Sequence, residues 1–300
     1  MALDNLMVFG TAAVVMLAWV GLSVGSFLNV VIYRLPVMLE RAWTRIAREH
    51  LHEVGQTLPE STDAPEGEAP FNLAVPRSRC PECGTPIRIW QNIPVLSWLL
   101  LRGRCAACAA PIPVRYLAIE LLTGLVSIAV IATFSFSGFG YAALFFTWVL
   151  VAAAFIDFDT QLLPDQLTQP LLWTGLLVNS GAFPGLANPF GVSPADAILG
   201  AVVGYGSLWT VYWVFKLVTG KEGMGFGDFK LLGAICAWLG WQVLPATILM
   251  ASISGLIYAL IGMLRKRQAV GQPMPFGPFL AIGGWVCLIY RDTVLNLFSL

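Results

Sequence analysis

The sequence predicts an all-α polytopic membrane protein with about eight transmembrane helices and a small, zinc-ribbon-like cytoplasmic loop domain. Three observations predict this fold. Hydrophobic residues make up 57% of the 300 residues and charged residues only 11%, which is roughly half the charged share of a soluble protein. The apolar residues gather in blocks close to the ~20 residues that a membrane-spanning helix needs. The one long polar segment between these blocks contains two Cys-x-x-Cys pairs.

Eight apolar stretches are the expected spans. The amino terminus, MALDNLMVFG, has no basic residue before its apolar run and no small-x-small cleavage site, which favours a permanent anchor over a signal peptide. The sixth stretch is short and contains glycines. The expected spans are residues 7–33, 116–136, 141–158, 166–183, 195–218, 229–241, 243–264 and 276–298. The corresponding domains are a first transmembrane helix (1–33), a cytoplasmic loop domain (34–115) and a transmembrane core of about seven helices (116–300).

The basic residues orient these spans. Ten of the seventeen lysines and arginines lie in the polar segment, at Arg34, Arg41, Arg45, Arg48, Arg77, Arg79, Arg88, Arg102, Arg104 and Arg115. With eight spans, Lys216, Lys221, Lys230, Arg265, Lys266 and Arg267 fall on the same face. The positive-inside rule makes that face cytoplasmic, and only Arg291 lies near the other. The net charge of zero gives no reason to expect nucleic acid as a partner.

Residues 56–76 are rich in Pro, Glu, Thr and Gly, which predicts a flexible linker. Its acids, Glu60, Asp63, Glu66 and Glu68, are expected to be solvated, with attraction of a basic partner segment as the alternative. His50 and His52 lie in a polar, Arg-rich stretch and are expected to be solvated too.

Two similar sequences, CPECGTPI and CAACAAPI, form a small internal repeat within the polar segment. Two Cys-x-x-Cys turns can supply the four thiolates of a tetrahedral zinc site, here Cys80, Cys83, Cys105 and Cys108. Disulfides are the weaker alternative, because thiols stay reduced on the cytoplasmic side. A structural zinc ion suits a loop with so little apolar core. Cys236 and Cys287 lie inside spans and are expected to be ordinary buried residues.

Carboxylates within or at the ends of spans are the candidate functional residues, because ionisable groups are costly in lipid. They are Glu120, Asp157, Asp159, Asp165 and Asp228. Two membrane crossings separate FIDFDTQLLPD (155–165) from GMGFGDFK (223–230), which returns the chain to the same face. We therefore expect Asp157 and Asp228 at one depth, at the cytoplasmic ends of the third and sixth spans.

Two carboxylates held close together share a proton, because both cannot ionise cheaply. The ionised carboxylate can take a proton from water while the protonated one hydrogen-bonds a scissile carbonyl. This pairing favours aspartyl proteolysis. The glycines before Asp228 (Gly223, Gly225 and Gly227) would allow an extended peptide to approach closely. The alternative for this segment is a flexible turn with Asp228 as a helix cap.

Helix geometry distinguishes the three carboxylates of the first cluster. Pro164 should end the third span just before it, which leaves Asp157 in the last helical turns. Asp159 should point roughly 200° away from Asp157 around the helix. Asp165 follows the break and is expected to cap the next span.

Several motifs make the chain resemble the bacterial type IV prepilin peptidases. They occur in family order: GSFLNVVIYRLP (25–36), two Cys-x-x-Cys pairs flanking IPVLSWLLLRGRC (93–105), RYLAIELLTG (115–124), IDFDTQLLPD (156–165) and GKEGMGFGDFKLLG (220–233). The resemblance implies cleavage of basic leaders from prepilins and type II secretion pseudopilins at the cytoplasmic face of the bacterial inner membrane. It also implies that Asp157 and Asp228 are the catalytic pair.

The resemblance further implies N-methylation of the new amino terminus with S-adenosylmethionine. No glycine-rich dinucleotide fingerprint is present, so the donor site is placed by resemblance alone, near Gly103 in the cysteine-containing loop. Glu120 has two interpretations, pairing with Arg115 or Lys230, or ordering the substrate.

Two other classes of protein fit the sequence less well. A transporter would carry its acids near mid-membrane, often in matching halves of an inverted repeat, whereas these acids lie at one membrane edge and no such repeat is visible. A zinc-stapled scaffold would not need paired aspartates.

Overall fold

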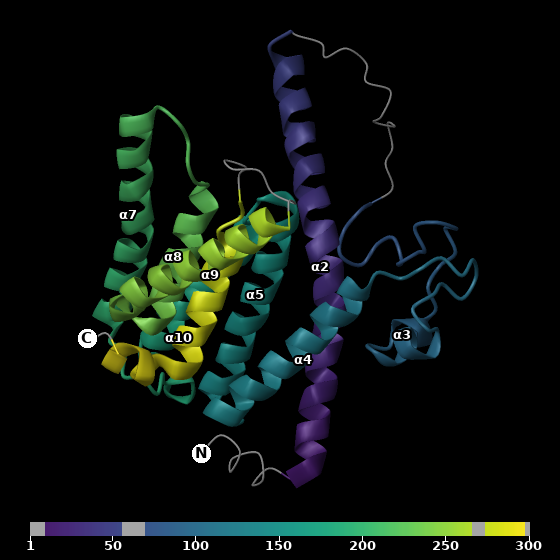
Figure 1. The fold of residues 1–300 in the computed structure, drawn as a ribbon, viewed down its shortest axis with the longest axis horizontal. Coiled ribbons are helices and arrows are strands. Elements are labelled where there is room, and N and C mark those ends of the chain that lie inside the picture. Colours follow the sequence, from purple (N-terminus) through teal and green to yellow (C-terminus); the bar gives the residue numbers. More distant parts are fainter. Residues whose placement is uncertain (1–9, 56–69, 266–273, 298–300) are drawn as a thin grey trace. The chain divides into compact units, whose positions relative to one another are not determined.

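The computed structural model describes residues 10–55, 70–265 and 274–297, and apart from the largely irregular segment 70–113 most of these residues are helical (Figure 1). The helices are α2 (Gly10–Glu53), α3 (Leu96–Leu100), α4 (Val114–Phe134), α5 (Gly138–Thr160), α6 (Asp165–Asn179), α7 (Pro194–Thr219), α8 (Phe226–Leu239), α9 (Leu244–Leu264) and α10 (Gly277–Leu297). Short 3-10 turns occur at Ile89–Asn92, Pro184–Leu186 and Trp241–Val243. Within the described ranges there are two isolated β-bridges and no extended strand. The all-helical prediction is confirmed.

Each expected span coincides with one helix, although the helices differ in length. Six described helices (α2, α4, α5, α7, α9 and α10) are long and apolar enough to cross a membrane. Helices α6 and α8 have 15 and 14 residues, fewer than the ~20 of a full span. Helix α8 is buried along almost its whole length, so protein rather than lipid surrounds it. The chain is therefore a multi-pass membrane protein.

The first helix does not end at residue 33, the boundary expected from the sequence. Helix α2 continues through Pro36 to Glu53 and so includes residues expected to lie in the loop. The charged residues that mark the end of a membrane span do not end a helix, because Arg and Glu are good helix formers. The ion pair between Arg45 and Glu49, at positions i and i+4, adds a small stabilisation to the exposed second half of α2. The start of the expected first span, at residues 7–9, lies outside the described residues, as does most of the expected linker.

Internal contacts divide the chain into two compact units. We call Met1–Ala18 with Leu125–Leu300 the helical-core unit, and Trp19–Gly124 the cysteine unit. The cysteine unit is larger than the expected loop domain of residues 34–115, because parts of α2 and α4 pack within it.

Helix α8 is the centre of the helical-core unit, where it contacts α6, α7 and α10. Trp238 near its end is fully buried, packs against the ring of Phe146 at 5.1 Å, and donates its indole N–H to the carbonyl of Leu171 at 2.8 Å. A side chain at Gly204 of α7 would lie 2.9 Å from the Leu232 carbonyl oxygen, so the two helix backbones are in close contact. The predicted burial of Cys236 is confirmed in this helix. This packing gives the first turn of α8 a fixed position.

Candidate functional site

Asp157 and Asp228 come from two helix ends of the helical-core unit. Asp157 lies in the last turn of α5, which stops at Gln161, a residue in the left-handed conformation. Asp228 lies in the first turn of α8, after the N-cap residue Gly225. Both side chains are buried, with 5% and 7% of their surface exposed, and the two carboxyl groups interact electrostatically. The structure therefore brings together the two acids that the spans placed at one depth.

The two carboxyl groups have different surroundings. Oδ2 of Asp157 accepts a hydrogen bond of 2.9 Å from the backbone N–H of Gly277, the first residue of α10. Oδ1 of Asp228 is buried and has no hydrogen-bond partner within the described ranges. A buried polar atom without a partner is uncommon, and a bound substrate or water is one way to satisfy it.

Leu163, Gly227 and Gly277 form a close contact beside these acids. A Cβ at Gly227 would lie 2.6 Å from the Cβ of Leu163, and a Cβ at Gly277 would lie 3.1 Å from its Cδ1. A Cβ at Gly225 would have no neighbour within 4 Å. In the segment before Asp228, close packing therefore requires glycine at position 227 but not at position 225. Neither Leu163 nor Gly277 was predicted from the sequence. The Gly-Pro pair in PFGPFL, at the start of a span, is the signal that could have pointed to Gly277.

The other two acids of the first cluster lie outside this pair. Asp159 is exposed at the end of α5. The expectation that Asp165 caps α6 is wrong, because Pro164 occupies the N-cap position and no side-chain cap bond forms. Asp165 instead pairs with Lys230 of α8, with Nζ and Oδ1 at 2.6 Å.

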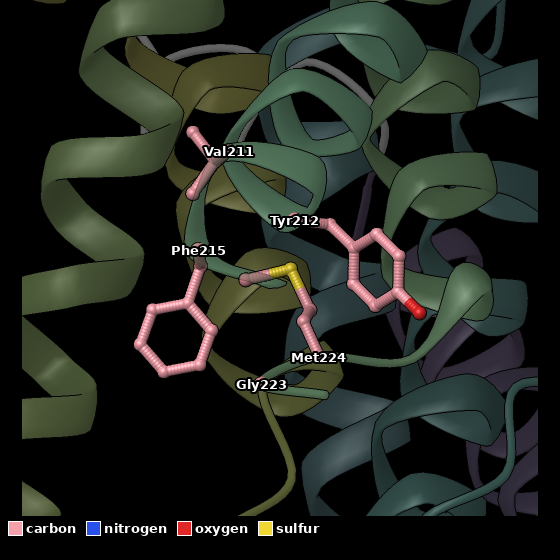
Figure 2. Close-up of a pocket in the computed structure, with 5 residues that line it drawn as sticks. All are labelled: Val211, Tyr212, Phe215, Gly223 and Met224. Carbon is pink, nitrogen blue, oxygen red and sulfur yellow. The ribbon is translucent and has the colours of Figure 1, made fainter. Parts of the chain in front are cut away.

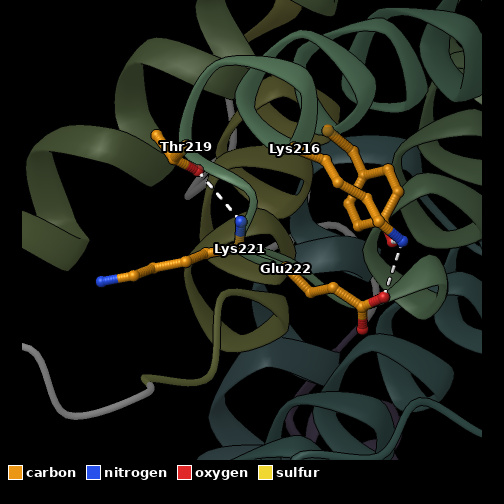
Figure 3. A network of polar contacts seen from close by, with 5 residues as sticks. Lys216, Thr219, Lys221 and Glu222 are labelled. Carbon is orange, nitrogen blue, oxygen red and sulfur yellow. Dashed lines mark hydrogen bonds and ion pairs between the residues drawn. The ribbon is translucent and has the colours of Figure 1, made fainter.

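The segment between α7 and α8 precedes Asp228, and an ion pair and a hydrogen bond connect it to the end of α7. Nζ of Lys216 lies 2.8 Å from Oε1 of Glu222, and the backbone N–H of Lys221 donates to the Thr219 hydroxyl at 3.3 Å (Figure 3). The hydrogen bond and charge of Lys216 lower the pKa of Glu222 below its usual range. The turn itself begins at Gly220, which has a φ of +69°.

A small apolar pocket lies beside this segment. It is lined by Val211, Tyr212, Phe215, Gly223 and Met224 (Figure 2). The ring of Tyr212 also contacts Phe226 at 5.2 Å and Phe229 at 5.9 Å, the aromatic residues on either side of Asp228. Aromatic packing therefore links α7 to the first turn of α8.

In the cysteine unit, the two Cys-x-x-Cys turns have the same backbone structure. In each turn the N–H of the first cysteine donates to the carbonyl five residues later, and its carbonyl accepts from the N–H four residues later. An isolated antiparallel bridge closes each turn. Gly84 and Ala109 occupy equivalent left-handed positions, with φ of +66° and +58°. The internal repeat in the sequence is thus also a structural repeat.

The four cysteines of these turns lie together. Their Sγ atoms are all within 4.8 Å of one another, and those of Cys80 and Cys108 are 3.8 Å apart. Zn–S bonds of about 2.3 Å would place the sulfurs of a tetrahedral site about 3.8 Å apart, so the donor set fits such an ion. Hydrogen bonds with the side chain and backbone of Thr85 lower the pKa of the Cys83 thiol to about 6, whereas burial and the neighbouring cysteines raise the pKa of Cys108 to about 12. Cys83 thus readily supplies the thiolate that a metal needs, while Cys108 would lose its proton only on binding the ion. All four cysteines are free of disulfides.

Glu120 of α4 lies within the cysteine unit and is buried there. Its Oε2 accepts a hydrogen bond of 2.7 Å from the N–H of Val95, and the Ser26 hydroxyl provides another. Lys230, one of the two cations considered for Glu120, pairs with Asp165. Val95 has a φ of +59°, which is strained for a β-branched residue, and the charged hydrogen bond helps to hold it.

Two further contacts organise the cysteine unit. Gly103, expected near a donor site, has a φ of +66°, and a Cβ there would lie 2.8 Å from the Trp98 ring. Arg34 of α2 is buried and donates to the carbonyls of Asn72 and Pro76 at 2.8 and 2.6 Å. From the sequence, Arg34 served only as a topology signal, although its place in the motif GSFLNVVIYRLP could have marked it.

Known proteins match this chain along most of its length. A family model described as the Bacterial Peptidase A24 N-terminal domain matches residues 19–134, and one described as the Type IV leader peptidase family matches residues 144–260. A protein named "Prepilin leader peptidase/N-methyltransferase" from Aeromonas hydrophila is 52% identical, over 91% of this chain and 89% of its own length. Proteins of the same name from Stutzerimonas stutzeri (53% identical, 91% and 89% covered) and Pseudomonas aeruginosa (49%, 97% and 95%) match similarly. No solved structure matches.

Proposed function

This chain belongs to the type IV leader peptidase family, and on that premise we propose that it cleaves the leader peptides of prepilins and type II secretion pseudopilins and then N-methylates the new amino terminus. The observation that carries the proteolytic half of this proposal is the buried pair Asp157 and Asp228, which meets at the ends of two helices. Two carboxyl groups that cannot both ionise cheaply are the acid and base that peptide hydrolysis needs.

In the proposed reaction, one carboxylate takes a proton from water and the water oxygen attacks the scissile carbonyl carbon. The other carboxyl group donates a hydrogen bond and then its proton to the carbonyl oxygen, which forms a tetrahedral intermediate. Collapse of this intermediate breaks the C–N bond. The leaving amine takes a proton from the carboxyl that first accepted one, and the other carboxylate takes a proton back from a hydroxyl group of the intermediate. The pair thereby returns to its starting state.

We place this chemistry at the cytoplasmic face of the bacterial inner membrane. Within the helical-core unit, Lys216, Lys221 and Lys230 gather around the segment that leads into Asp228. Basic residues at span ends favour the cytoplasmic side. The substrates would accordingly be cut before their new amino termini are exported.

The four cysteines would hold a structural zinc ion. Thiolates of Cys80, Cys83, Cys105 and Cys108 would close the site, and each turn already presents its pair through the same backbone hydrogen bonds. Two short turns with little apolar burial need such a link to stay together.

S-adenosylmethionine, when bound, would supply the methyl group for the new amine. By family resemblance, the proposed donor site is the region around Gly103. Contact with the Trp98 ring already accounts for glycine at that position, so the residues that hold the donor are to be sought among its neighbours in the cysteine unit.

The test combines both activities in one measurement. Purified protein is incubated with a prepilin, with and without S-adenosylmethionine, and the product is weighed by mass spectrometry. We expect loss of the leader in both reactions and addition of one methyl group only with the donor. Asp157→Asn and Asp228→Asn should each abolish cleavage while the protein still accumulates. Undiminished cleavage in either variant would refute the two-aspartate mechanism, and a cleaved but unmethylated product would restrict the function to proteolysis.

A further inference from the structure

The backbone of Gly277 contacts one catalytic candidate directly. Its N–H donates to Oδ2 of Asp157 at 2.9 Å, from the first residue of α10. The first N–H groups of a helix have no partner within the helix and carry a partial positive charge. They therefore suit a negatively charged oxygen. The donor is a backbone group in a buried position, so its direction is fixed by α10 rather than by a side-chain rotamer.

The missing side chain at this position is as important as the N–H. A Cβ at Gly277 would lie 2.8 Å from Oδ2 of Asp157 and 3.1 Å from its Cγ. Real Cβ atoms do not approach a neighbouring atom this closely, so any other residue here would displace the carboxyl group or the start of α10. The same residue thus supplies the hydrogen bond and the space that the carboxyl group occupies.

The carboxyl group of the partner acid has a backbone hydrogen bond with Gly225, the N-cap residue of α8, but not both of its oxygens are satisfied. Oδ1 of Asp228 is buried without a hydrogen-bond partner in the described part of the chain. A hydrogen bond from an N–H favours the charged form of a carboxyl group, whereas a carboxyl oxygen that is buried without a donor favours the neutral form, in which that oxygen carries the proton. The two acids share one site but not one environment.

We propose that Gly277 is a positioning residue that orients Asp157 as the base toward water and thereby leaves Asp228 as the proton-bearing acid. This inference rests on the proposed peptidase function and assigns roles within it. The α10 backbone decides the roles, because it meets only one of the two carboxyl groups.

The first test compares two glycines of α10. Gly277→Ala introduces a methyl group against the carboxyl group of Asp157. Gly284→Ala introduces a methyl group 2.8 Å from Cδ1 of Ile235, an apolar side chain, and so tests crowding without a carboxyl group. We expect kcat for leader cleavage to fall about 100-fold in Gly277→Ala, since displacement of a catalytic group by about 1 Å has this scale of effect. KM should change little, and the acid limb of the pH–rate profile should move to higher pH. Gly284→Ala should keep the parent pH profile. Equal losses and equal profiles in the two variants would overturn the proposal.

The second test does not depend on Gly277→Ala folding. Infrared spectra of the parent protein at neutral pH should contain the C=O stretch of a protonated carboxyl group. This band should persist in Asp157→Asn and disappear in Asp228→Asn. The opposite result, or no change in either variant, would overturn the assignment. Absence of prepilin cleavage by the parent protein would refute the proposed function, and cleavage by both variants would refute the two-aspartate mechanism. Abolished cleavage in the variants together with the opposite infrared pattern would overturn only the role of Gly277.

Discussion

The helical-core unit and the cysteine unit hold their candidate sites by different means. Asp157 and Asp228 are buried, lie far apart in the sequence and meet only because several helices pack around α8. The cysteines come from two short copies of one turn, and Cys83 and Cys108 are exposed. Hydrophobic packing can position a carboxyl group without help, whereas exposed thiols need a shared ion. The acid pair is therefore a product of tertiary structure, whereas the cysteine cluster is a product of local structure that the proposed zinc ion would complete.

The largest expected effect is on the paired acids. Asp157→Asn or Asp228→Asn should lower leader cleavage by at least roughly 10²–10⁴-fold, the contribution of a general acid or base. The exposed Asp159 provides the matched control, and Asp159→Asn should be much milder. Methylation of a pilin that has already been cleaved should persist in the inactive variants, because the cysteine unit is untouched. Loss of both activities would show that the two units do not act separately. Cleavage and methyl incorporation are measured on the same samples.

Removal of the ion should have the next largest effect, confined to the cysteine unit. Structural zinc contributes on the order of 10 kcal/mol to folding of small domains, so chelation should expose the backbone amides of residues 78–112 to hydrogen exchange. The helical-core amides, which depend on apolar burial, should stay protected. Cys83→Ser should lower the bound zinc in elemental analysis, whereas Cys287→Ser should not, because Cys287 is buried within α10. A full zinc content in Cys83→Ser would contradict the four-cysteine site.

A smaller effect should separate two neighbouring glycines. A methyl group at Gly227 would clash with Leu163, while one at Gly225 would enter open space. Gly227→Ala should therefore lower stability by about 1–3 kcal/mol, the usual cost of overpacking, and Gly225→Ala should change it little. Thermal unfolding in detergent measures both. Similar destabilisation by the two variants would show that the flexibility of the segment, rather than close packing, requires its glycines.

The smallest expected effect concerns the ion pair of Asp165 with Lys230. The carboxylate side chain is 56% exposed, so water screens the pair despite its distance of 2.6 Å. Lys230→Met should lower the free energy of unfolding by about 0–1 kcal/mol, the range of surface pairs. A much larger loss, measured in the same unfolding assay, would indicate that this pair helps to position the first turn of α8.

Sequence patterns predicted the large features of both units well. Apolar blocks located the long helices, although not the polar second half of α2, because burial in lipid or protein requires apolar side chains. The repeated Cys-x-x-Cys turns predicted the cysteine cluster, since their geometry is local. The count of membrane crossings predicted that Asp157 and Asp228 lie at the same face of the membrane. The same reasoning could not separate a full span from the shorter α8, whose apolar residues face other helices.

Contacts between distant segments were less predictable. Asp165 has the position of a helix cap in the sequence, but a lysine on another helix binds it. Lys230 was one of the two cations expected to pair with Glu120, but it pairs with Asp165, and Oε2 of Glu120 accepts a hydrogen bond from the backbone of Val95. In each case the choice depended on which partner folding brought nearest, and no local pattern records that distance.

The sequence by itself therefore determined the helical class, the membrane location of the spans, the four-cysteine repeat and the two acids worth pairing. Only the tertiary structure decided that Gly277 donates to Asp157, while Oδ1 of Asp228 has no partner among the described residues. The physical reason is that hydrophobicity and turn geometry are properties of short segments. The direction of one N–H toward one carboxyl oxygen depends on how α5, α8 and α10 pack together.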